Sequence, residues 1–319
     1  MFDKRTTMKQ HQLTDTVVMI SPDQFGFNPE TAVTNVFQHN LTEEGLSEQI
    51  IRDTALEEFQ QMVTVLKEHQ INVLVLPSRK DVVTPDAVFP NNWFSHHENN
   101  LLILYPMLTP NRRVERQPKA LTALLASAGI PHPTVKDLAN DEHKGNILEG
   151  TGSLVLDREH QVAFAMGSPR TTKAEFEKWC KEMDYQGIFF HAYDAKRFPI
   201  YHTNVVMSIG REYVVICLDS ISDTNEKEKV IQTLKTLNKE IIPISIEQLK
   251  SFCGNILQAL STKGEVIIIM SDSAWEAFTP QQQKILHKYG EIIPVHIPTI
   301  EKVSGGSARC MLAEIFSVE

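Results

Sequence analysis

The feature of this sequence that most constrains its fold is a polar turn that returns about every 55 residues. The turns contain Asn92, Gly152, Asn204, Asn255 and Cys310, which are separated by about 60, 52, 51 and 55 residues. Each turn lies beside the start of an apolar strand or helix, and a fixed period of this size indicates a repeated supersecondary unit. A unit of two or three strands and one helix is too small to bury its own apolar face, so the units must pack against one another.

Each unit is predicted to contain two short strands, an amphipathic helix and a further strand. In one of them, apolar strands at 153–156 and 162–165 precede a helix at 173–183. A doubly wound sheet would instead repeat at about 30 residues and carry G-x-G-x-x-G after its first strand, which this sequence lacks. We therefore predict ββαβ modules packed around an axis, with the polar turns, including Glu149 and His202, converging on one cavity.

Composition sets the broad limits. The 319 residues, 42% of them hydrophobic, are predicted to form a single domain over 1–319, with a flexible N-terminal tail at 1–15. The net charge of -9 is spread without a basic block, which argues against a nucleic-acid partner. The chain shows neither a signal peptide nor a membrane-length apolar run, so we expect a cytoplasmic protein. Its four cysteines show no C-x-x-C spacing, and no H-E-x-x-H is present, so we expect free thiols, no metal and no cofactor.

The last turn, Gly305-Gly-Ser-Ala-Arg-Cys310, presents a cysteine in an unusual setting. The two glycines permit backbone conformations and close approaches that a side chain would block, and 308–316 has helix-forming composition. We therefore expect Cys310 at the start of a helix, where backbone N–H groups and the helix dipole stabilise a thiolate. A buried cysteine taken alone is more often a packing residue, so its role depends on its partners.

A cysteine nucleophile needs a base, and the base needs a group that orients it. His202 opens the strand predicted at 205–209, and Glu149 precedes a Gly-Thr-Gly loop at the start of another strand. Taken alone, Glu149 fits a helix cap or a surface carboxylate equally well. Asn255, in Cys253-Gly-Asn255, is predicted to be a structural turn residue outside the site.

Three motifs resemble those of a known superfamily. Leu148-Glu149-Gly-Thr-Gly-Ser153, Tyr201-His202-Thr-Asn204-Val205 and Gly305-Gly-Ser-Ala-Arg-Cys310 are similar, in order and spacing, to the carboxylate, histidine and cysteine motifs of guanidino-group-modifying enzymes. That superfamily contains arginine deiminases, dimethylarginine dimethylaminohydrolases and amidinotransferases. The resemblance covers 18–316 and is greatest to the amidinotransferase-like branch that contains citrulline-utilisation hydrolases. It implies an α/β fold: a five-module pseudo-symmetric ββαβ propeller, the pentein fold.

The resemblance also implies catalytic roles. Cys310 would attack the central carbon of a guanidinium or ureido group and form a covalent intermediate. His202 would protonate the leaving amine and then deprotonate the hydrolytic water. Glu149 would bind N–H groups of the substrate and help to orient His202.

Further residues resemble those that hold the substrate in this superfamily. Asp86 resembles the residue that binds the substrate's α-amino group, while Arg112 and Arg170 resemble those that pair with its α-carboxylate. The forked donors of an arginine suit a carboxylate. Taken alone, Arg112 in Asn111-Arg-Arg-Val-Glu-Arg116 also fits a solvated charge at a helix start.

Two positions depart from the arginine deiminase pattern, in which aspartates stand in place of Asn92 and Asn204. A neutral amide matches a neutral ureido group better than a cation. We therefore predict hydrolysis of citrulline to ornithine, ammonia and carbon dioxide. The alternatives are an arginine deiminase or dimethylarginine dimethylaminohydrolase, an amidinotransferase that passes the amidino group to an amine, and a non-enzymatic binding protein. In each case the partner is a small guanidino or ureido amino acid, without membrane association, and a homo-oligomer is compatible with the sequence.

Overall fold

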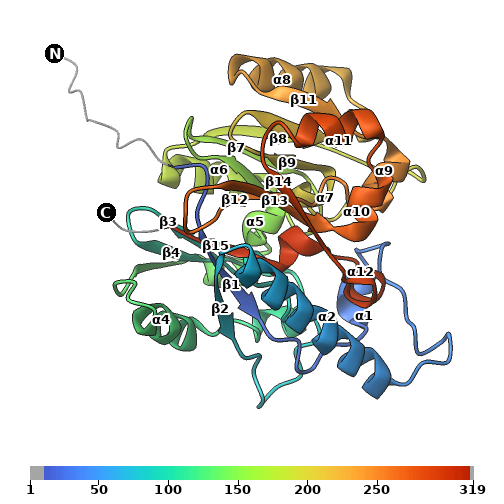
Figure 1. Ribbon diagram of the computed structural model, residues 1–319. Coiled ribbons are helices and arrows are strands. Elements are labelled where there is room, and N and C mark those ends of the chain that lie inside the picture. The colour runs from blue at the N-terminus through green and yellow to red at the C-terminus, as the bar shows by residue number, and fades with distance from the viewer. Residues whose placement is uncertain (1–10, 317–319) are drawn as a thin grey trace.

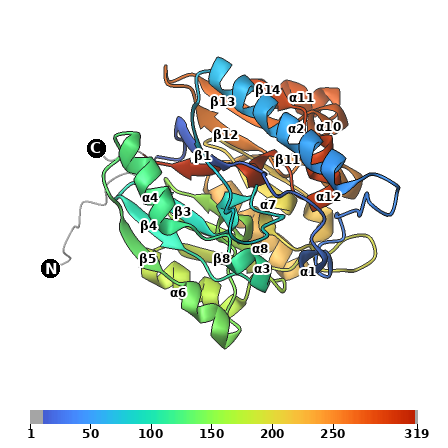
Figure 2. The ribbon, with the colours of Figure 1, turned by 90° about the horizontal axis from the view of Figure 1, so that it is seen from below.

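The computed structural model describes residues 11–316 of the chain. They form five sheets of three strands each, set around a common axis (Figure 1). In every sheet the first strand of the unit pairs antiparallel with the second, and the second pairs parallel with the third. Helices such as α2, α4 and α6 lie at the outside of the ring (Figure 2). This arrangement confirms the predicted α/β propeller of ββαβ modules.

The strands belong to the sheets in chain order. The first four modules hold β3 (Phe94–His97), β4 (Leu101–Leu104), β5 (Thr134–Asp137), β6 (Leu154–Asp157), β7 (Val162–Met166), β8 (Gln186–Phe190), β9 (Met207–Ile209), β10 (Tyr213–Ile216), β11 (Glu240–Pro243), β12 (Leu257–Leu260), β13 (Val266–Ser271) and β14 (Glu291–Val295). The fifth holds β15 (Ala313–Ile315), β1 (Thr16–Ile20) and β2 (Asn72–Leu76).

The helices that connect the second strand of each module to its third are α4 (Pro118–Ser127), α6 (Lys173–Met183), α8 (Thr224–Thr236), the pair α10 (Asp272–Ala277) and α11 (Pro280–Leu286), and α2 (Glu48–Glu68). Each buries its apolar side, as α6 does with Phe176, Trp179 and Cys180. The other helices are α1 (Pro29–Ala32), α3 (Pro110–Arg113), α5 (Gly150–Ser153), α7 (Thr203–Val206), α9 (Ile246–Lys250), α12 (Pro298–Ser304), η1 (Pro90–Asn92), η2 (Ala139–Lys144), η3 (Leu218–Ser220) and η4 (Ala308–Met311). No helix within 11–316 is long and apolar enough to cross a bilayer.

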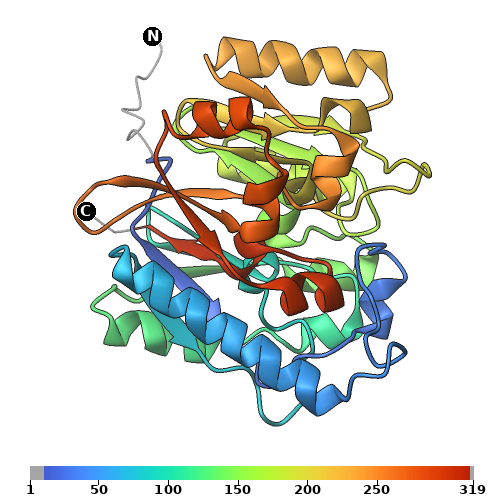
Figure 3. The same ribbon diagram turned by 45° about the vertical axis from the view of Figure 1, so that its right-hand side comes forward.

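Both ends of the chain close the ring. Strand β15, near the C-terminus, pairs antiparallel with β1 in the register Thr16↔Ile315, and β1 pairs parallel with β2 (Figures 1 and 3). The helix predicted over 308–316 is therefore wrong: the segment makes one 3₁₀ turn, η4, and then joins the sheet. Its helix-forming composition is overridden because β1 offers a free edge whose backbone groups need partners.

Four of the five inner strands are preceded by a short helical turn: η1 before β3, α5 before β6, α7 before β9 and η4 before β15. In the remaining module a turn at 251–254 lies just before β12. The turns pack on one another, since α5 contacts both η1 and α7, and η1 contacts η4. They also bond between modules: the hydroxyl of Thr203 donates to the carbonyl of Ser153 at 2.6 Å. The polar turns thus meet at one end of the axis.

The prediction of a flexible tail at 1–15 does not hold for residues 12–14, which are buried. Residues 1–10 lie outside the described residues, but Gln12, Leu13 and Thr14 are buried. The amide of Gln12 donates to the carbonyl of Leu156 at 2.9 Å, and its oxygen accepts from the backbone N–H of Arg158 at 2.7 Å. These bonds fix the segment that leads into β1.

Glycine at the turns allows neighbouring modules to approach closely, and we predict that Gly254→Ala destabilises the protein. A β-carbon at Gly254 would lie 2.2 Å from the carbonyl oxygen of Val205, which belongs to backbone and cannot rotate away. The expected loss in the free energy of unfolding is at least about 3 kcal/mol, measured by urea denaturation. Gly26→Ala is the control, because a β-carbon there meets nothing within 4 Å. Equal losses in the two variants would show that the turns are loosely packed.

Candidate active site

The polar turns enclose a buried cavity with about 250 Å³ of empty space. Six of the predicted site residues line it: Asp86, Asn92, Arg112, Arg170, His202 and Cys310. The other two, Glu149 and Asn204, each bond a residue that lines it. Residues far apart in the sequence are therefore brought into one place, as the convergence of the turns predicts.

A buried contact in the site joins His202 and Glu149. The Nε2 atom of His202 lies 2.8 Å from Oε2 of Glu149, and each side chain is only about 1% exposed. Burial lowers the pKa of His202 to about 4, although the bond to Glu149 opposes that shift. His202 is therefore a neutral base near neutral pH, with its ring oriented by a carboxylate.

Glu149 stays ionised in spite of its burial. Burial alone would raise its pKa, but the charge of Arg170 and the contact with His202 outweigh it and bring the pKa to about 2. The guanidinium of Arg170 lies 3.7 Å from Oε2 of Glu149, and the backbone N–H of Leu108 donates to Oε1 at 3.0 Å. A fixed negative charge therefore stands behind His202, where it would stabilise an imidazolium.

Two carboxamides surround the thiol of Cys310. The Nδ2 atoms of Asn204 and Asn255 lie 3.4 Å and 3.2 Å from its sulfur. Asn255 also donates to the carbonyl of Asn204 at 2.8 Å, which links the two turns. The prediction that Asn255 is only a structural turn residue is therefore wrong. Its place in the repeat, one period after Asn204, is the signal that would have assigned it to the site.

Asp86 holds an acceptor that faces the cavity. Its Oδ2 atom accepts from Asn28 at 2.6 Å and from Thr31 at 2.9 Å. Its other oxygen, Oδ1, is buried and has no hydrogen-bond partner among residues 11–316. A buried carboxylate oxygen without a donor suits a cationic group such as an α-ammonium. Asn28 and Thr31 were not among the site residues predicted from the sequence.

Arg112 is buried, so the solvated helix-start interpretation does not hold. Its guanidinium donates to both oxygens of Glu115, to Oδ1 of Asn92 at 2.6 Å and to the carbonyls of Asp86 and Phe89. These bonds hold the turn that carries Asp86 and Asn92. Burial raises the pKa of Glu115 to about 7, against the opposing charge of Arg112. Glu115 was not predicted from the sequence, because its role depends on this burial.

Arg170 spans the cavity wall. Its Nε atom donates to Oγ1 of Thr34 at 3.1 Å, and one terminal nitrogen donates to the carbonyl of Thr31 at 3.0 Å. Its Cζ atom lies 5.0 Å from the centre of the Tyr201 ring. Tyr201 in turn bonds the carbonyl of Gly305. Arg170 therefore connects the 28–38 segment to the hydrogen-bonded side chains of His202 and Glu149.

In this conformation the cavity is narrow: only about 10 Å³ of it is accessible to the centre of a water molecule. This is room for about one water. A substrate the size of an amino acid can bind only if part of the wall moves. The wall at 35–38 is held to the turn before Cys310 by the bond from Nδ2 of Asn35 to the carbonyl of Ser304 at 3.1 Å. Within 11–316, no three His, Cys, Asp or Glu residues are grouped so that they could hold a metal ion.

A family model described as N,N dimethylarginine dimethylhydrolase, eukaryotic, matches residues 21–317. This match supports the predicted superfamily, and it favours a guanidino-group hydrolase, which the sequence analysis held as the alternative to citrulline hydrolysis. A search of curated proteins gave no significant match.

Solved structures share the fold. The substrate-bound N-terminal domain of ArgZ, an arginine dihydrolase of cyanobacteria, is 17% identical with a TM-score of 0.71, covering 95% of this chain and 98% of that one. A variant of AgrE with L-arginine is 20% identical with a TM-score of 0.72, covering 95% and 40%. The DDAH of Pseudomonas aeruginosa with citrulline is 14% identical with a TM-score of 0.62, covering 95% and 99%.

The burial of neutral His202 predicts a loss of stability in mild acid. Its pKa in the folded protein lies below the ordinary 6.5, so the unfolded chain binds the proton first and stability falls as the pH drops from about 6.5 towards about 4. Between about pH 7 and about pH 5 the His202 contribution is about 2 kcal/mol. Urea denaturation at both pH values should show that, between pH 7 and pH 5, the free energy of unfolding of His202→Gln falls by about 2 kcal/mol less than that of the wild type. The exposed His143→Gln should behave like the wild type. An equal loss in all three proteins would contradict a buried neutral His202.

Proposed function

Since this chain belongs to the eukaryotic N,N dimethylarginine dimethylhydrolase family, we propose that it uses Cys310 to hydrolyse a C–N bond of a guanidino or ureido amino acid. Enzymes of this family are hydrolases that act on amidine C–N bonds. The single observation that supports the role of Cys310 is that it lines the same cavity as His202, which Glu149 holds at 2.8 Å.

The first half of the reaction forms a covalent intermediate. The sulfur of Cys310 attacks the central carbon of the guanidino or ureido group, and neutral His202 takes the thiol proton. The resulting imidazolium is stabilised by ionised Glu149 and gives its proton to the leaving nitrogen. That nitrogen departs as an amine or ammonia when its bond to the central carbon breaks, and the carbon stays bonded to sulfur.

The second half restores the enzyme. His202, neutral again, takes a proton from a water, and the hydroxide attacks the central carbon. The C–S bond then breaks and the sulfur recovers the proton from His202. During both steps the Nδ2 atoms of Asn204 and Asn255, near the sulfur, would stabilise negative charge that develops on it.

The rest of the cavity fits the backbone end of an amino acid. The unpartnered Oδ1 of Asp86 would accept a hydrogen bond from the α-ammonium group. Arg170 would exchange its bonds to Thr34 and Thr31 for the α-carboxylate when the wall moves. Arg112 is already saturated by Glu115 and the 86–92 turn, so it would act by holding Asp86 and Asn92 in place.

The family match favours a guanidino substrate, arginine or an N-methylated arginine, and it favours hydrolysis over transfer of the amidino group to an amine. Two carboxylates, Asp86 and Glu149, remain near the cavity to offset a cationic group. This is the first candidate.

The second candidate is citrulline, which would give ornithine, ammonia and carbon dioxide. Its support is that the side chains bonded to the sulfur of Cys310 are amides, Asn204 and Asn255, with Asn92 nearby. Amides have both a donor and an acceptor and match the C=O and NH₂ of a ureido group without charge. Glu149 is already paired with Arg170 and His202, which leaves less negative charge for a cation.

Parallel assays of arginine, dimethylarginine, citrulline and agmatine test the proposal. Ammonia or dimethylamine, citrulline and ornithine are measured with the wild type and Cys310→Ala. At least one of the three amino acids should be consumed, and Cys310→Ala should lose activity by at least about a thousandfold. Agmatine lacks the α-carboxylate and should react more slowly. An active Cys310→Ala, or an inactive wild type, would contradict the proposal.

The same assay separates the two candidates with Asn204→Asp. A carboxylate beside Cys310 should raise kcat/KM for arginine relative to citrulline by about tenfold or more, even if both rates fall. Asn238→Asp is the control, because Asn238 is exposed just after α8 and does not line the cavity. An unchanged ratio in Asn204→Asp would remove the charge argument for citrulline.

A further inference from the structure

A second buried cavity lies beside the catalytic one, and Asn204 links the two. Asn204 lines this second cavity while its Nδ2 atom donates to the sulfur of Cys310, which lines the catalytic cavity. The walls come from the inner strands β6, β9 and β12, from Gln12, and from Arg309 and Glu314 on either side of the Cys310 turn. The centre of a water can occupy about 30 Å³ of it, enough for about two waters or one small ion.

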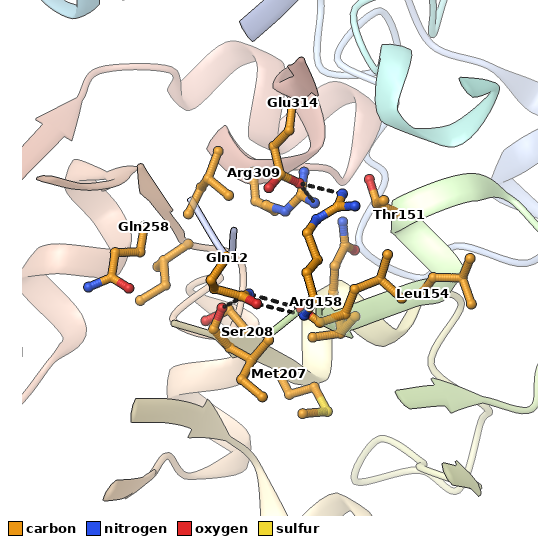
Figure 4. Close-up of a pocket in the computed structure, with 15 residues that line it drawn as sticks. Gln12, Thr151, Leu154, Arg158, Met207, Ser208, Gln258, Arg309 and Glu314 are labelled. Atoms are coloured by element: carbon orange, nitrogen blue, oxygen red, sulfur yellow. Dashed lines mark hydrogen bonds and ion pairs between the residues drawn. The ribbon is translucent and has the colours of Figure 1, made fainter. Parts of the chain in front are cut away.

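The charged side chains of this cavity do not balance. Arg158 and Arg309 are buried, and both approach the same oxygen of Glu314: Arg309 donates at 2.9 Å and Arg158 lies 3.8 Å away (Figure 4). Glu314 is the only acidic residue among those that line the cavity. Two guanidinium groups that share one carboxylate leave a net positive charge in a buried place.

Nearby groups do not neutralise that charge. Arg158 also lies 3.3 Å from Nδ1 of His97 and 4.2 Å from the centre of the Phe316 ring. Burial, reinforced by the charge of Arg158, lowers the pKa of His97 well below its usual range, so His97 is neutral. The neighbouring Asp157 is paired with Lys239 at 2.8 Å. Because a buried charge without a partner is costly, the cavity favours a counter-ion.

The cavity also holds a free hydroxyl. Ser208 is 8% exposed, and its Oγ atom has no hydrogen-bond partner within 11–316. The two glutamines on the wall are occupied: Gln12 donates to the carbonyl of Leu156, and Gln258 donates to that of Tyr289. The groups left to bind a ligand are therefore mainly donors, two guanidinium groups and one O–H, beside one unpartnered acceptor, Oδ1 of Asn204.

We propose that this cavity binds one small monovalent anion between Arg158, Arg309 and Ser208. The size of the cavity and its single excess charge fit chloride or bicarbonate, which share one negative charge and accept hydrogen bonds. Binding there does not depend on the reaction at Cys310. The anion would stabilise the turn that carries Cys310, because Arg309 precedes Cys310 and donates to the carbonyl of Leu312 at 2.9 Å.

Thermal denaturation at constant ionic strength tests this site. Chloride or bicarbonate replaces gluconate, which is too large for the cavity. At saturation by the ion that binds, the midpoint should rise by ~2 °C or more. The ion that acts at the lower concentration is the better ligand. No difference from gluconate with either ion would overturn the proposal.

Two variants should change the affinity in opposite directions. Arg158→Gln leaves a neutral Arg309–Glu314 pair and should abolish the anion-dependent rise. Glu314→Gln leaves two guanidinium groups without a carboxylate and should bind the anion at least about tenfold more tightly. Arg211→Gln is the control, since Arg211 is 40% exposed and pairs with Glu159. It should respond like the wild type.

The variants also distinguish anion binding in this cavity from a general effect of salt on stability. If Arg158→Gln does not fold, Glu314→Gln still decides the matter, and a Glu314→Gln variant that binds no more tightly than the wild type would overturn the proposal. Crystals soaked in bromide should show an anomalous peak between Arg158, Arg309 and Ser208. Bromide found only elsewhere would contradict the site.

Discussion

The pairing of β15 with β1 is the contact on which the rest of the structure depends. It closes the ring of modules with the two ends of the chain and places the η4 turn against η1. Because neighbouring modules share apolar clusters, an open ring would expose apolar surface at both free edges. Closure also brings Cys310, near the C-terminus, to the cavity that His202 lines and beside the turns of Asn204 and Asn255. The same strand pairing therefore closes the fold and completes the site.

Burial of charge organises both cavities, with different outcomes. In the catalytic cavity the acids and bases are paired: Glu149 with Arg170 and His202, and Arg112 with Glu115. The charge of Arg170 and the contact with His202 keep Glu149 ionised, and burial keeps His202 neutral, which is the protonation state that general-base catalysis requires. In the second cavity Arg158 and Arg309 share Glu314 and leave an excess positive charge. Asn204 lies between the two, since it lines the second cavity and its Nδ2 atom donates to the sulfur of Cys310, which lines the catalytic one.

The sequence predicts the fold better than it predicts local structure. The period of the polar turns was sufficient to predict the modules and the convergence of Glu149, His202 and Cys310. A repeat determines which residues lie at the same end of the axis. Asn255 was missed because its turn was judged singly and not as the counterpart of Asn204. The helix expected over 308–316 was wrong because composition does not reveal the free edge of β1. Glu115 and the cavity of Arg158 and Arg309 could not be predicted, since their partners come from distant turns and strands.

The central claim is that the sulfur of Cys310 forms a bond to the central carbon of the substrate. The most direct measurement is mass spectrometry of the wild-type protein, mixed with the substrate that it consumes, quenched in acid and digested. We expect a peptide containing Cys310 whose mass is raised by the guanidino or ureido carbon with its retained substituents. Turnover without any such adduct, or an adduct on Cys180, Cys217 or Cys253 instead, would contradict it.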